Sequence, residues 1–514
     1  MQLKLFLKKM NKHSFLQEGN RRPFHLFSLV ILLISLNQTL WKPAPTQQET
    51  NWSIPQTIPG YDPETWTPFL VADQNRTVHA FTDQWVTASD GSSKRVILYN
   101  QWTYENGWTT PVDILLSPVK EARVTAVHLD ENGTFHIVFF GGDNTGADMY
   151  YSQAPAQYAA EANAWSTPEI IGENAGDPAV SSIFEDDNGK LYVLYNGRQQ
   201  GIGLYLVSSN DGGSNWSNPS PIFYANSDEP NISQLKVVKG RAGWFHAIWA
   251  VYSKDGQGRG IYYSRSQNGD QWSEPQLLAE SQEGLGTQTP TIIQYGETLI
   301  SIFNLPPKIY MRRSIDDGLT WSDPSILFPR HVGVNGSIST VIDGNDTLHM
   351  FFGQRISGNP DIHGMWHSIW MDDHWTEPEA VIRGPKVHDL EGSTSFDPYE
   401  ANAVVSQGND ILVTWISDPG LKGNGVWYSY RILDAPEAPL NAIPTVVPQN
   451  ATPLPTSQLP IPSPQATETT VVTTTQNPLF LQKEPSGFGI GLRVVLAVGV
   501  IFVVVVWAVR RKNH

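Results

Sequence analysis

The stretch Trp216-Ser-Asn-Pro219 decides the fold of this chain, because its pattern of Trp, Ser or Thr, any residue and Pro returns at regular intervals. Seven copies of this Trp motif begin at Trp52, Trp108, Trp165, Trp216, Trp272, Trp321 and Trp375. The interval is close to fifty residues. A repeat of this length built of short alternating strands is typical of a radial β array, in which each unit buries its faces against its neighbours.

Alternating apolar residues before each Trp motif predict two further strands per repeat. Aromatic-rich second strands are expected at Leu191–Tyr195, Trp244–Trp249, Thr298–Phe303, Leu348–Phe352 and Ile411–Trp415. Third strands begin at Met149, Leu204, Ile261, Ile309, Met365 and Val426. A turn rich in Gly, Asp and Asn follows, and we place the Trp motif in the outermost strand, where Pro is tolerated. With an inner strand, four strands per repeat predict a β-propeller.

The two ends of the repeat region complete each other. Residues 397–433 supply three strands with no Trp motif after them, whereas Trp52 opens a Trp motif with no strands before it. We therefore predict an all-β, seven-bladed propeller of four-stranded blades whose N-terminal strand closes the last blade, with a six-bladed ring as the alternative. Closing the ring in this way removes the open edge between the first and last units.

Outside the propeller of residues 45–433, the composition predicts targeting and anchoring segments. Residues 1–44 combine a basic start with an apolar run at 24–36, as in a signal peptide or an uncleaved signal anchor. Residues 434–486 are rich in Pro and Thr and are predicted to be a disordered stalk. Residues 487–509 are apolar and long enough for a transmembrane helix, and the basic tail 510–514 follows. The positive-inside rule then predicts a single-pass cell-membrane protein with a cytoplasmic C-terminus and an extracellular propeller.

Composition excludes several classes of function. The chain has no cysteine, so disulfides, thiol chemistry and Cys-ligated metals are excluded. A formal net charge of −16 argues against nucleic acid as a partner. No His, Asp and Glu cluster has the spacing of a metal site. We therefore expect no metal and no cofactor, and a partner that is an extracellular glycan or a surface protein.

Two turns before the Trp motif match Ser-x-Asp-x-Gly-x-x-Trp, from Ser209 to Trp216 and from Ser314 to Trp321. This pattern resembles the Asp box of the sialidase (BNR-repeat) superfamily of β-propellers. In such a turn the Asp accepts backbone N–H bonds, Gly supplies a positive φ and Trp packs over the hairpin. We interpret the matching residues as structural; they are Ser209, Asp211, Gly213, Trp216, Ser314, Asp316, Gly318 and Trp321.

Ligands are expected on the face formed by the loops that enter each blade and by the loops that join second and third strands. The entry loops bring Tyr61, Asp62, Arg123, Asp177, Asp228, Glu229, Arg330, His331, Asp397, Tyr399 and Glu400. The inner connecting loops bring Trp85, Asp143, Arg198, Arg259, Arg355, Asp361 and His363. Arginines bind carboxylates bidentately, and paired carboxylates can perform acid/base chemistry on a sugar.

The resemblance to sialidases assigns roles to some of these residues. In that family three arginines hold the substrate carboxylate, a Tyr–Glu pair is the nucleophile and an Asp is the acid/base catalyst. The matching candidates are Arg123, Arg198 and Arg355 for the arginines, Tyr399 with Glu400 for the pair, and Asp177 or Asp228 for the acid. Trp85 is a further candidate, because its ring can stack against a sugar.

Two functions are compatible with these residues, and whether the protein is an enzyme stays open. The first is a membrane-anchored propeller that recognises a glycan or a protein at the cell surface. The alternative is an exo-glycosidase of sialidase type that hydrolyses terminal acidic sugars of extracellular glycans. The Arg-Ile-Pro segment that opens sialidase domains is absent, and its nearest echo is Arg355-Ile-Ser357. This departure favours recognition.

Overall fold

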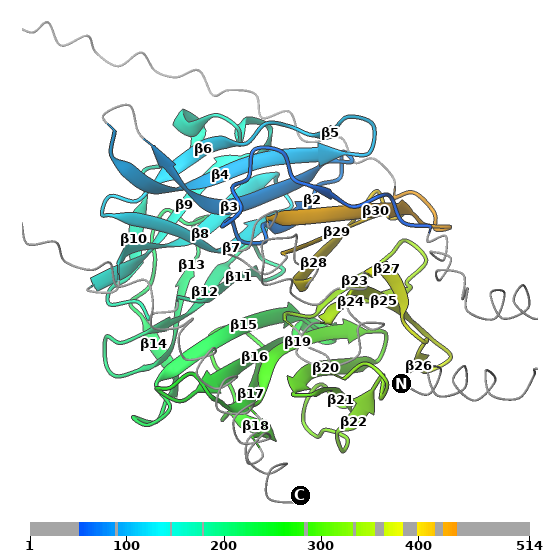
Figure 1. The fold of residues 1–514 in the computed structure, drawn as a ribbon. Helices are drawn as coiled ribbons and strands as arrows, with labels where there is room; N and C mark the ends of the chain where they lie inside the picture. Colours follow the sequence, from blue (N-terminus) through cyan, green and yellow to red (C-terminus); the bar gives the residue numbers. More distant parts are fainter. Residues whose placement is uncertain are drawn as a thin grey trace, which may run out of the picture. The chain divides into compact units, whose positions relative to one another are not determined.

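Seven antiparallel sheets are arranged in a ring around a common axis (Figure 1). The computed structural model describes residues 51–87, 91–143, 146–176, 179–281, 286–332, 336–354, 364–383, 398–416 and 425–438. The predicted signal segment, most of the predicted stalk, the predicted membrane helix and the tail lie outside these ranges. Within the described ranges, no helix combines the length and the apolar character needed to cross a membrane.

Each blade is a meander that runs outward from the axis. The first three blades comprise β2 (Phe69–Ala72), β3 (Val78–Thr87), β4 (Ser93–Thr103), β5 (Gly107–Trp108) and β6 (Val112–Leu116); β7 (Glu121–Leu129), β8 (Thr134–Asp143), β9 (Gly146–Pro155) and β10 (Glu169–Gly172); and β11 (Ser181–Glu185), β12 (Leu191–Gly197), β13 (Gly203–Ser209) and β14 (Ser220–Tyr224).

The next three comprise β15 (Asn231–Lys239), β16 (Phe245–Tyr252), β17 (Gly258–Ser266) and β18 (Gln276–Glu280); β19 (Gln288–Tyr295), β20 (Thr298–Leu305), β21 (Lys308–Ser314) and β22 (Ser325–Leu327); and β23 (Ser339–Ile342), β24 (Leu348–Gln354), β25 (Gly364–Met371), β26 (His374–Trp375) and β27 (Glu379–Arg383). The predicted second and third strands of these repeats are confirmed.

The seventh blade joins the two ends of the propeller. Its strands are β28 (Tyr399–Ser406), β29 (Asp410–Ile416) and β30 (Val426–Ile432), with β1 (Gln56–Thr57) as the outermost strand. Gln56 pairs with Tyr428 in an antiparallel register. The innermost strands contact one another in ring order from β2 through β28 and back to β2. The predicted seven blades and their closure by the N-terminal strand are therefore confirmed.

The Ser or Thr of the Trp motif forms the same pair of hydrogen bonds in every blade. In blade 3 the Ser217 N–H donates to the Ser208 carbonyl at 2.8 Å, and the Ser208 N–H donates to the Ser217 Oγ at 3.0 Å. The same two bonds join the Ser or Thr of all seven copies to the third strand of the blade. A hydroxyl thus replaces a carbonyl as the acceptor, which explains why no other residue type stands there.

The placement of proline in the outermost strand was wrong in detail. In every copy the Pro comes directly before the outer strand, as Pro219 comes before Ser220 and Pro275 before Gln276. Proline has no N–H to give to a ladder, and its ring restricts the preceding residue to extended conformations. The Pro therefore sets the direction of the strand without occupying a place in its hydrogen-bond ladder.

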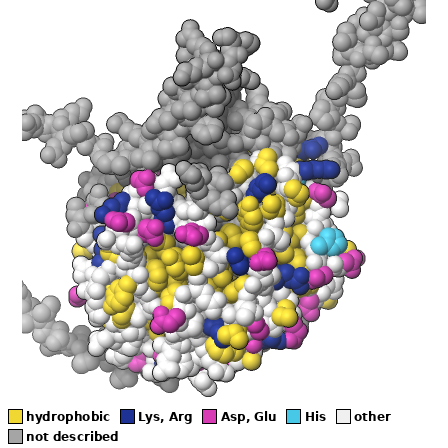
Figure 2. Space-filling view, turned by 90° about the horizontal axis from the view of Figure 1, so that it is seen from below, with side chains coloured by type: hydrophobic (Ala, Val, Ile, Leu, Met, Phe, Trp, Pro, Cys, Tyr) yellow, Lys and Arg dark blue, Asp and Glu magenta, His cyan; other side chains and the backbone are white. Residues whose placement is uncertain are grey.

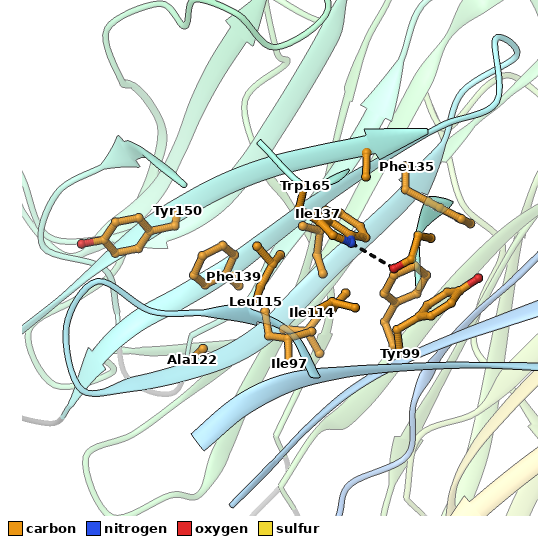
Figure 3. Packing of buried hydrophobic residues seen from close by; sticks show 14 of the residues in the cluster. Ile97, Tyr99, Ile114, Leu115, Ala122, Phe135, Ile137, Phe139, Tyr150 and Trp165 are labelled. Atoms are coloured by element: carbon orange, nitrogen blue, oxygen red, sulfur yellow. Dashed lines mark hydrogen bonds between the residues drawn. The ribbon is translucent and has the colours of Figure 1, made fainter. Parts of the chain in front are cut away.

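The hydrophobic core lies between neighbouring blades. Between blades 1 and 2, the Trp165 ring packs edge-on against Phe81 with centroids 6.1 Å apart, and Phe81 packs in the same way against Phe135 at 5.0 Å. The Trp165 Nε1–H donates to the Ala159 carbonyl at 3.0 Å, the bond drawn in Figure 3. Burial of these large rings stabilises each blade against the next.

The Asp-box turns lie between third and fourth strands. Asp211 Oδ1 accepts from the Ser209 hydroxyl at 2.8 Å and from the Asn215 N–H at 2.9 Å, while the Gly213 N–H donates to Ser209 Oγ at 2.9 Å. Hydrogen bonds from Asn215 and Ser209 lower the pKa of the Asp211 carboxyl. The Trp216 ring packs edge-on against Tyr151 at 4.9 Å. These contacts join the turn to the neighbouring blade.

The second Asp-box turn repeats this geometry. Asp316 Oδ1 accepts from Ser314 at 2.7 Å, the Gly318 N–H donates to Ser314 Oγ at 2.9 Å, and Trp321 packs against Tyr263 at 5.0 Å. In both turns the Asp carboxylate accepts hydrogen bonds from residues of its own hairpin.

The chain leaves the propeller across the turns that join first and second strands. The Asn345 amide donates to the Asp434 carbonyl at 2.8 Å, and Arg76 forms an ion pair of 2.5 Å with Glu437. The chain also enters there, because Ser53 lies beside Tyr430, near the end of β30. Both ends of the propeller therefore lie at the same end of its blades.

The part of the surface drawn in colour in Figure 2 carries hydrophobic side chains in its middle, with lysines, arginines and acidic residues interspersed along them. Leu277 of β18 and Ile326 of β22 are among the exposed hydrophobic residues of outer strands. Charges of both signs alternate on this face, so it presents no extended field of one sign.

Candidate functional site

The face expected to bind a ligand is defined by the strand order. In a four-stranded antiparallel meander, the first strand begins, the second ends and the third begins at the same end of the sheet. We call this end of the ring the mouth. The Asp-box turns, the entry of the chain at Ser53 and its exit at Asp434 all lie at the opposite end.

Five side chains gather at the mouth of blades 1 and 2, and we call them the mouth cluster: Asp83, Trp85, Arg95, Glu121 and Arg123. Arg95 Nε donates to Asp83 Oδ2 at 2.5 Å. Arg123 donates to Glu121 Oε2 through Nη2 at 2.7 Å and through Nε at 3.1 Å. Arg95 Nη1 lies 4.0 Å from the same Glu121 oxygen. Glu121 therefore bridges the two arginines.

The alternation of side chains in β3 positions this cluster. Asp83 and Trp85 are two residues apart, so they lie on the same face of the strand. Trp85 pairs directly with Arg95 of β4. The indole is 38 % exposed, whereas Asp83 is buried. We expected Trp85 in a connecting loop, but it lies in strand β3. The pairing of β3 with β4 extends beyond it, to Thr87 and Ser93.

The electrostatics of the cluster are balanced. Burial raises the pKa of Asp83, and the charges of Arg95 and Arg123 oppose this shift. The Val124 N–H donates to Asp83 Oδ1 at 3.2 Å, which ties the carboxylate to the next blade. Two guanidinium groups and two carboxylates leave no net charge. The cluster presents fixed donors and acceptors, which is a surface suited to hydroxyl groups.

The other predicted sugar-binding arginines lie elsewhere or outside the described ranges. Arg198 follows β12 and is exposed, and its backbone N–H donates to the Asn174 carbonyl at 2.9 Å. Arg355 lies outside the described residues. The structure therefore brings Arg123 close to Arg95, which sequence reasoning missed, and places Arg198 on a neighbouring blade.

The predicted catalytic carboxylates do not share a neighbourhood among the described residues. Asp228 is exposed in the loop before β15, where its backbone N–H donates to Asn226 Oδ1 at 3.2 Å. Asp177 lies outside the described residues. Glu400 belongs to blade 7, at the start of β28.

Tyr399 and Glu400 have separate neighbours. Glu400 Oε2 accepts from the Ser337 N–H at 3.1 Å and from the Ser337 hydroxyl, which links blade 7 to blade 6. Its backbone has a φ of 55° at an irregularity of the β28 ladder. The Tyr399 ring is buried and packs edge-on against Trp66, with centroids 6.4 Å apart.

Sequence reasoning missed a lysine on an innermost strand. Lys236 lies on the innermost strand β15, and its side chain is accessible to water. Burial among surrounding protein atoms nevertheless lowers the pKa of its ammonium group, and the charge of Glu400 opposes this shift. Blades 4 and 7 are not neighbours in the ring, so this charge effect acts between two separated blades. Beside them, Gln234 Oε1 accepts from the Tyr252 hydroxyl at 2.6 Å.

The remaining mouth residues have structural contacts or are exposed. The Tyr61 hydroxyl donates to Asn100 Oδ1 at 2.7 Å, and burial raises its pKa. Asp143 forms an ion pair with Lys120. The His331 ring is buried against Trp366 at 4.6 Å. Asp62, Arg259 and Arg330 are exposed and Glu229 is half-buried, whereas Asp361, His363 and Asp397 lie outside the described residues.

No group of three or more His, Asp or Glu suited to a metal ion occurs among the described residues.

Comparisons with known proteins find likeness in structure alone. No family model and no curated protein matches the sequence. A protein of unknown function from Dyadobacter fermentans aligns with 74 % of this chain and 98 % of its own, at 14 % identity and a TM-score of 0.44. An ulvan lyase aligns with 74 % of this chain and 97 % of its own, at 13 % identity and a TM-score of 0.47. The NanB sialidase from Streptococcus pneumoniae aligns with 77 % of this chain and 72 % of its own, at 11 % identity and a TM-score of 0.40. Sialidases and polysaccharide lyases are thus among the propellers that this chain resembles.

Proposed function

We propose that this protein is a glycan-recognition propeller displayed at the cell surface, with the mouth cluster as its binding site. One observation carries the proposal: the exposed ring of Trp85 stands beside Arg95, whose guanidinium is fixed by Asp83. An indole face can stack on the C–H face of a sugar, while charged side chains in fixed positions hydrogen-bond its hydroxyl groups.

The geometry supports recognition more than the alternative, an exo-glycosidase acting on terminal acidic sugars. Arg123 already donates through Nε and Nη2 to Glu121, which leaves it fewer donors for a sugar carboxylate. Among the described candidates for catalysis, the Glu400 carboxylate accepts from Ser337, the Tyr399 ring is buried and Asp228 is exposed. Binding of a neutral, hydroxyl-rich glycan requires none of these groups to act as an acid, base or nucleophile.

Display at the surface is supported by the way the chain enters and leaves the ring. Both ends lie opposite the mouth, and the predicted stalk and membrane helix follow the exit at Asp434. A tether at that end points the mouth away from the membrane. The mouth is then presented to extracellular ligands.

The test is binding of the full chain, purified in a mild detergent, to an array of extracellular glycans. Trp85→Ala should weaken binding about fivefold or more, because stacking contributes on the order of 1 kcal/mol or more. Tyr158→Ala is the matched control, since Tyr158 is also exposed but lies between β9 and β10, away from the mouth. Equal binding by Trp85→Ala and wild type would contradict the proposal. Turnover of a fluorogenic sialoside that is lost in Arg198→Ala would favour the exo-glycosidase.

A further inference from the structure

Only two tryptophans in the described part of the chain are substantially exposed, and both lie at the mouth of blade 1. Trp66 is 48 % exposed and Trp85 is 38 % exposed, whereas every other described tryptophan is buried or half-buried. Large aromatic surface is costly to leave in water, so its concentration at one place indicates a binding surface.

The two tryptophans are anchored at different points along β3. Trp66 precedes β2, and its carbonyl accepts from the Thr82 hydroxyl of β3 at 3.1 Å. Trp85 is three residues further along β3 than Thr82, so the two anchoring points are about 10 Å apart along the strand. β2 pairs with β3 only as far as Phe81, so the inner edge of β3 between these points has no partner from β2.

Hydrogen bonds and an ion pair fix the surroundings of both tryptophans before any ligand binds. Gln84 Oε1 accepts from the Asp62 N–H at 2.9 Å and from the Thr65 hydroxyl at 2.6 Å, which fixes the loop that carries Trp66. The Tyr399 ring packs edge-on against Trp66. The cross-strand neighbour of Trp85 is fixed by its ion pair with Asp83. Preorganised rings lose little conformational entropy on binding.

Resting on the function proposed above, we propose that Trp66 and Trp85 are two stacking positions for one neutral oligosaccharide chain. The chain lies across the inner edge of β3 and is longer than a single sugar ring. Trp85 and the charge-balanced mouth cluster hold one part of the chain, and Trp66 holds another. The site therefore selects for chain length, which a site for one terminal sugar does not.

The test uses the full chain and an array of unbranched neutral oligosaccharides printed as length series, from single sugars to long chains. Wild type should bind long chains at least ~tenfold more tightly than single sugars. Trp66→Ala should remove this gain in affinity with chain length, and Trp66→Tyr should restore most of it. Tyr158→Ala is the control for loss of an exposed ring elsewhere.

The possible outcomes separate this inference from the proposed function. Single sugars that bind as tightly as long chains would contradict the two stacking positions and leave the glycan-binding function standing. The same holds if the affinity of Trp66→Ala rises with chain length as much as that of wild type. If no glycan on either array binds, both are wrong. If Trp66→Ala unfolds at the same temperature as wild type, a lower affinity for long chains comes from the missing ring and not from misfolding.

Discussion

The Ser429 hydroxyl donates a hydrogen bond of 2.8 Å to the carbonyl of Ser53, joining two residues 376 positions apart. Ser53 in turn accepts from the Tyr430 N–H through its hydroxyl at 2.9 Å. These bonds belong to the Trp motif of the N-terminal strand and to the third strand of the last blade. With the backbone pairing of β1 and β30, they form the polar contact that closes the ring.

Ser53→Ala should therefore lower the free energy of unfolding by about 1–2 kcal/mol, because it leaves the N–H of Tyr430 without its acceptor. Ser217→Ala removes the same bond inside blade 3, where the chain is continuous. Urea unfolding of both variants measures the effect. We expect Ser53→Ala to show in addition a faster exchange of amide hydrogens in β30. Equal exchange in β30 of Ser53→Ala and wild type would contradict a role in closure.

An Asp-box turn should tolerate no side chain at the glycine that contacts the neighbouring blade. Gly213 has a φ of 86°, and a Cβ there would lie 2.0 Å from the Tyr151 hydroxyl oxygen. Gly213→Ala should destabilise the protein by more than ~2 kcal/mol, since it combines backbone strain with overpacking. Gly212→Ala is the matched control, because Gly212 also has a positive φ, of 67°, but open space around its Cβ position.

Thermal unfolding of the two glycine variants separates the effects. The control should lose only about 1 kcal/mol, from strain. Losses of equal size would show that the contact with Tyr151 contributes nothing. Glycan binding of folded Gly213→Ala should equal that of wild type, since this turn lies at the end opposite the mouth.

Most of the fold could be predicted, because the signals that specify it are local. The Trp motif carries its own hydrogen-bond acceptor, so Ser217 can be recognised without knowing its partner Ser208. Closure of the ring followed from a Trp motif at Trp52 that lacked preceding strands. The position of proline was predicted less well, because the sequence alone does not say where the ladder of the outer strand begins.

The candidate site could be predicted only in part, because its contacts cross between blades. Trp85 and Arg123 were identified from the sequence, but Glu121 joins them through Arg95, and no local pattern relates those strands. The alternation of Asp83 and Trp85 was the available signal for a strand, although Trp85 was expected in a connecting loop. Trp66 gave no signal at all, since its exposure depends on how the loop before β2 is fixed.

A buried histidine of blade 4 should make the protein sensitive to acid. In blades 1, 2 and 6 a histidine Nε2 faces an Asp six residues earlier, as His136 faces Asp130 at 3.3 Å. In blade 4 the residue six positions before His246 is Gly240 instead of Asp. His246 Nε2 therefore has no hydrogen-bond partner among the described residues. Burial lowers the pKa of His246 to about 4.

The sign of the effect follows from proton binding. A histidine in the unfolded chain has a pKa of about 6.5, so between about pH 6.5 and pH 4 the unfolded state binds a proton that His246 in the folded state does not. The stability contributed by neutral His246 is full above about pH 6.5 and is lost as the pH falls towards 4, by up to ~1.4 kcal/mol per pH unit. His246→Phe should flatten the dependence of unfolding free energy on pH in this window. Parallel curves for variant and wild type would contradict the prediction.

Asp83 and Arg95 should be strongly coupled in a double-mutant cycle. Both side chains are largely buried, so removing either one takes from the other its main charged partner in a poorly solvated place. We expect each single alanine variant to lose about 3 kcal/mol of unfolding free energy and the double variant to lose less than the sum, by roughly 1–3 kcal/mol.

The matched control is the ion pair of Arg313 with Asp373, which has an N···O distance of 2.6 Å but an Asp373 side chain that is 70 % exposed. Its coupling should stay below ~1 kcal/mol, because water screens the charges and solvates either partner left alone. Raising the salt concentration should reduce the control coupling further and leave that of Asp83 with Arg95 nearly unchanged. Additive losses at the buried pair would mean that Asp83 does not fix Arg95, and that Glu121 holds the guanidinium beside Trp85 instead.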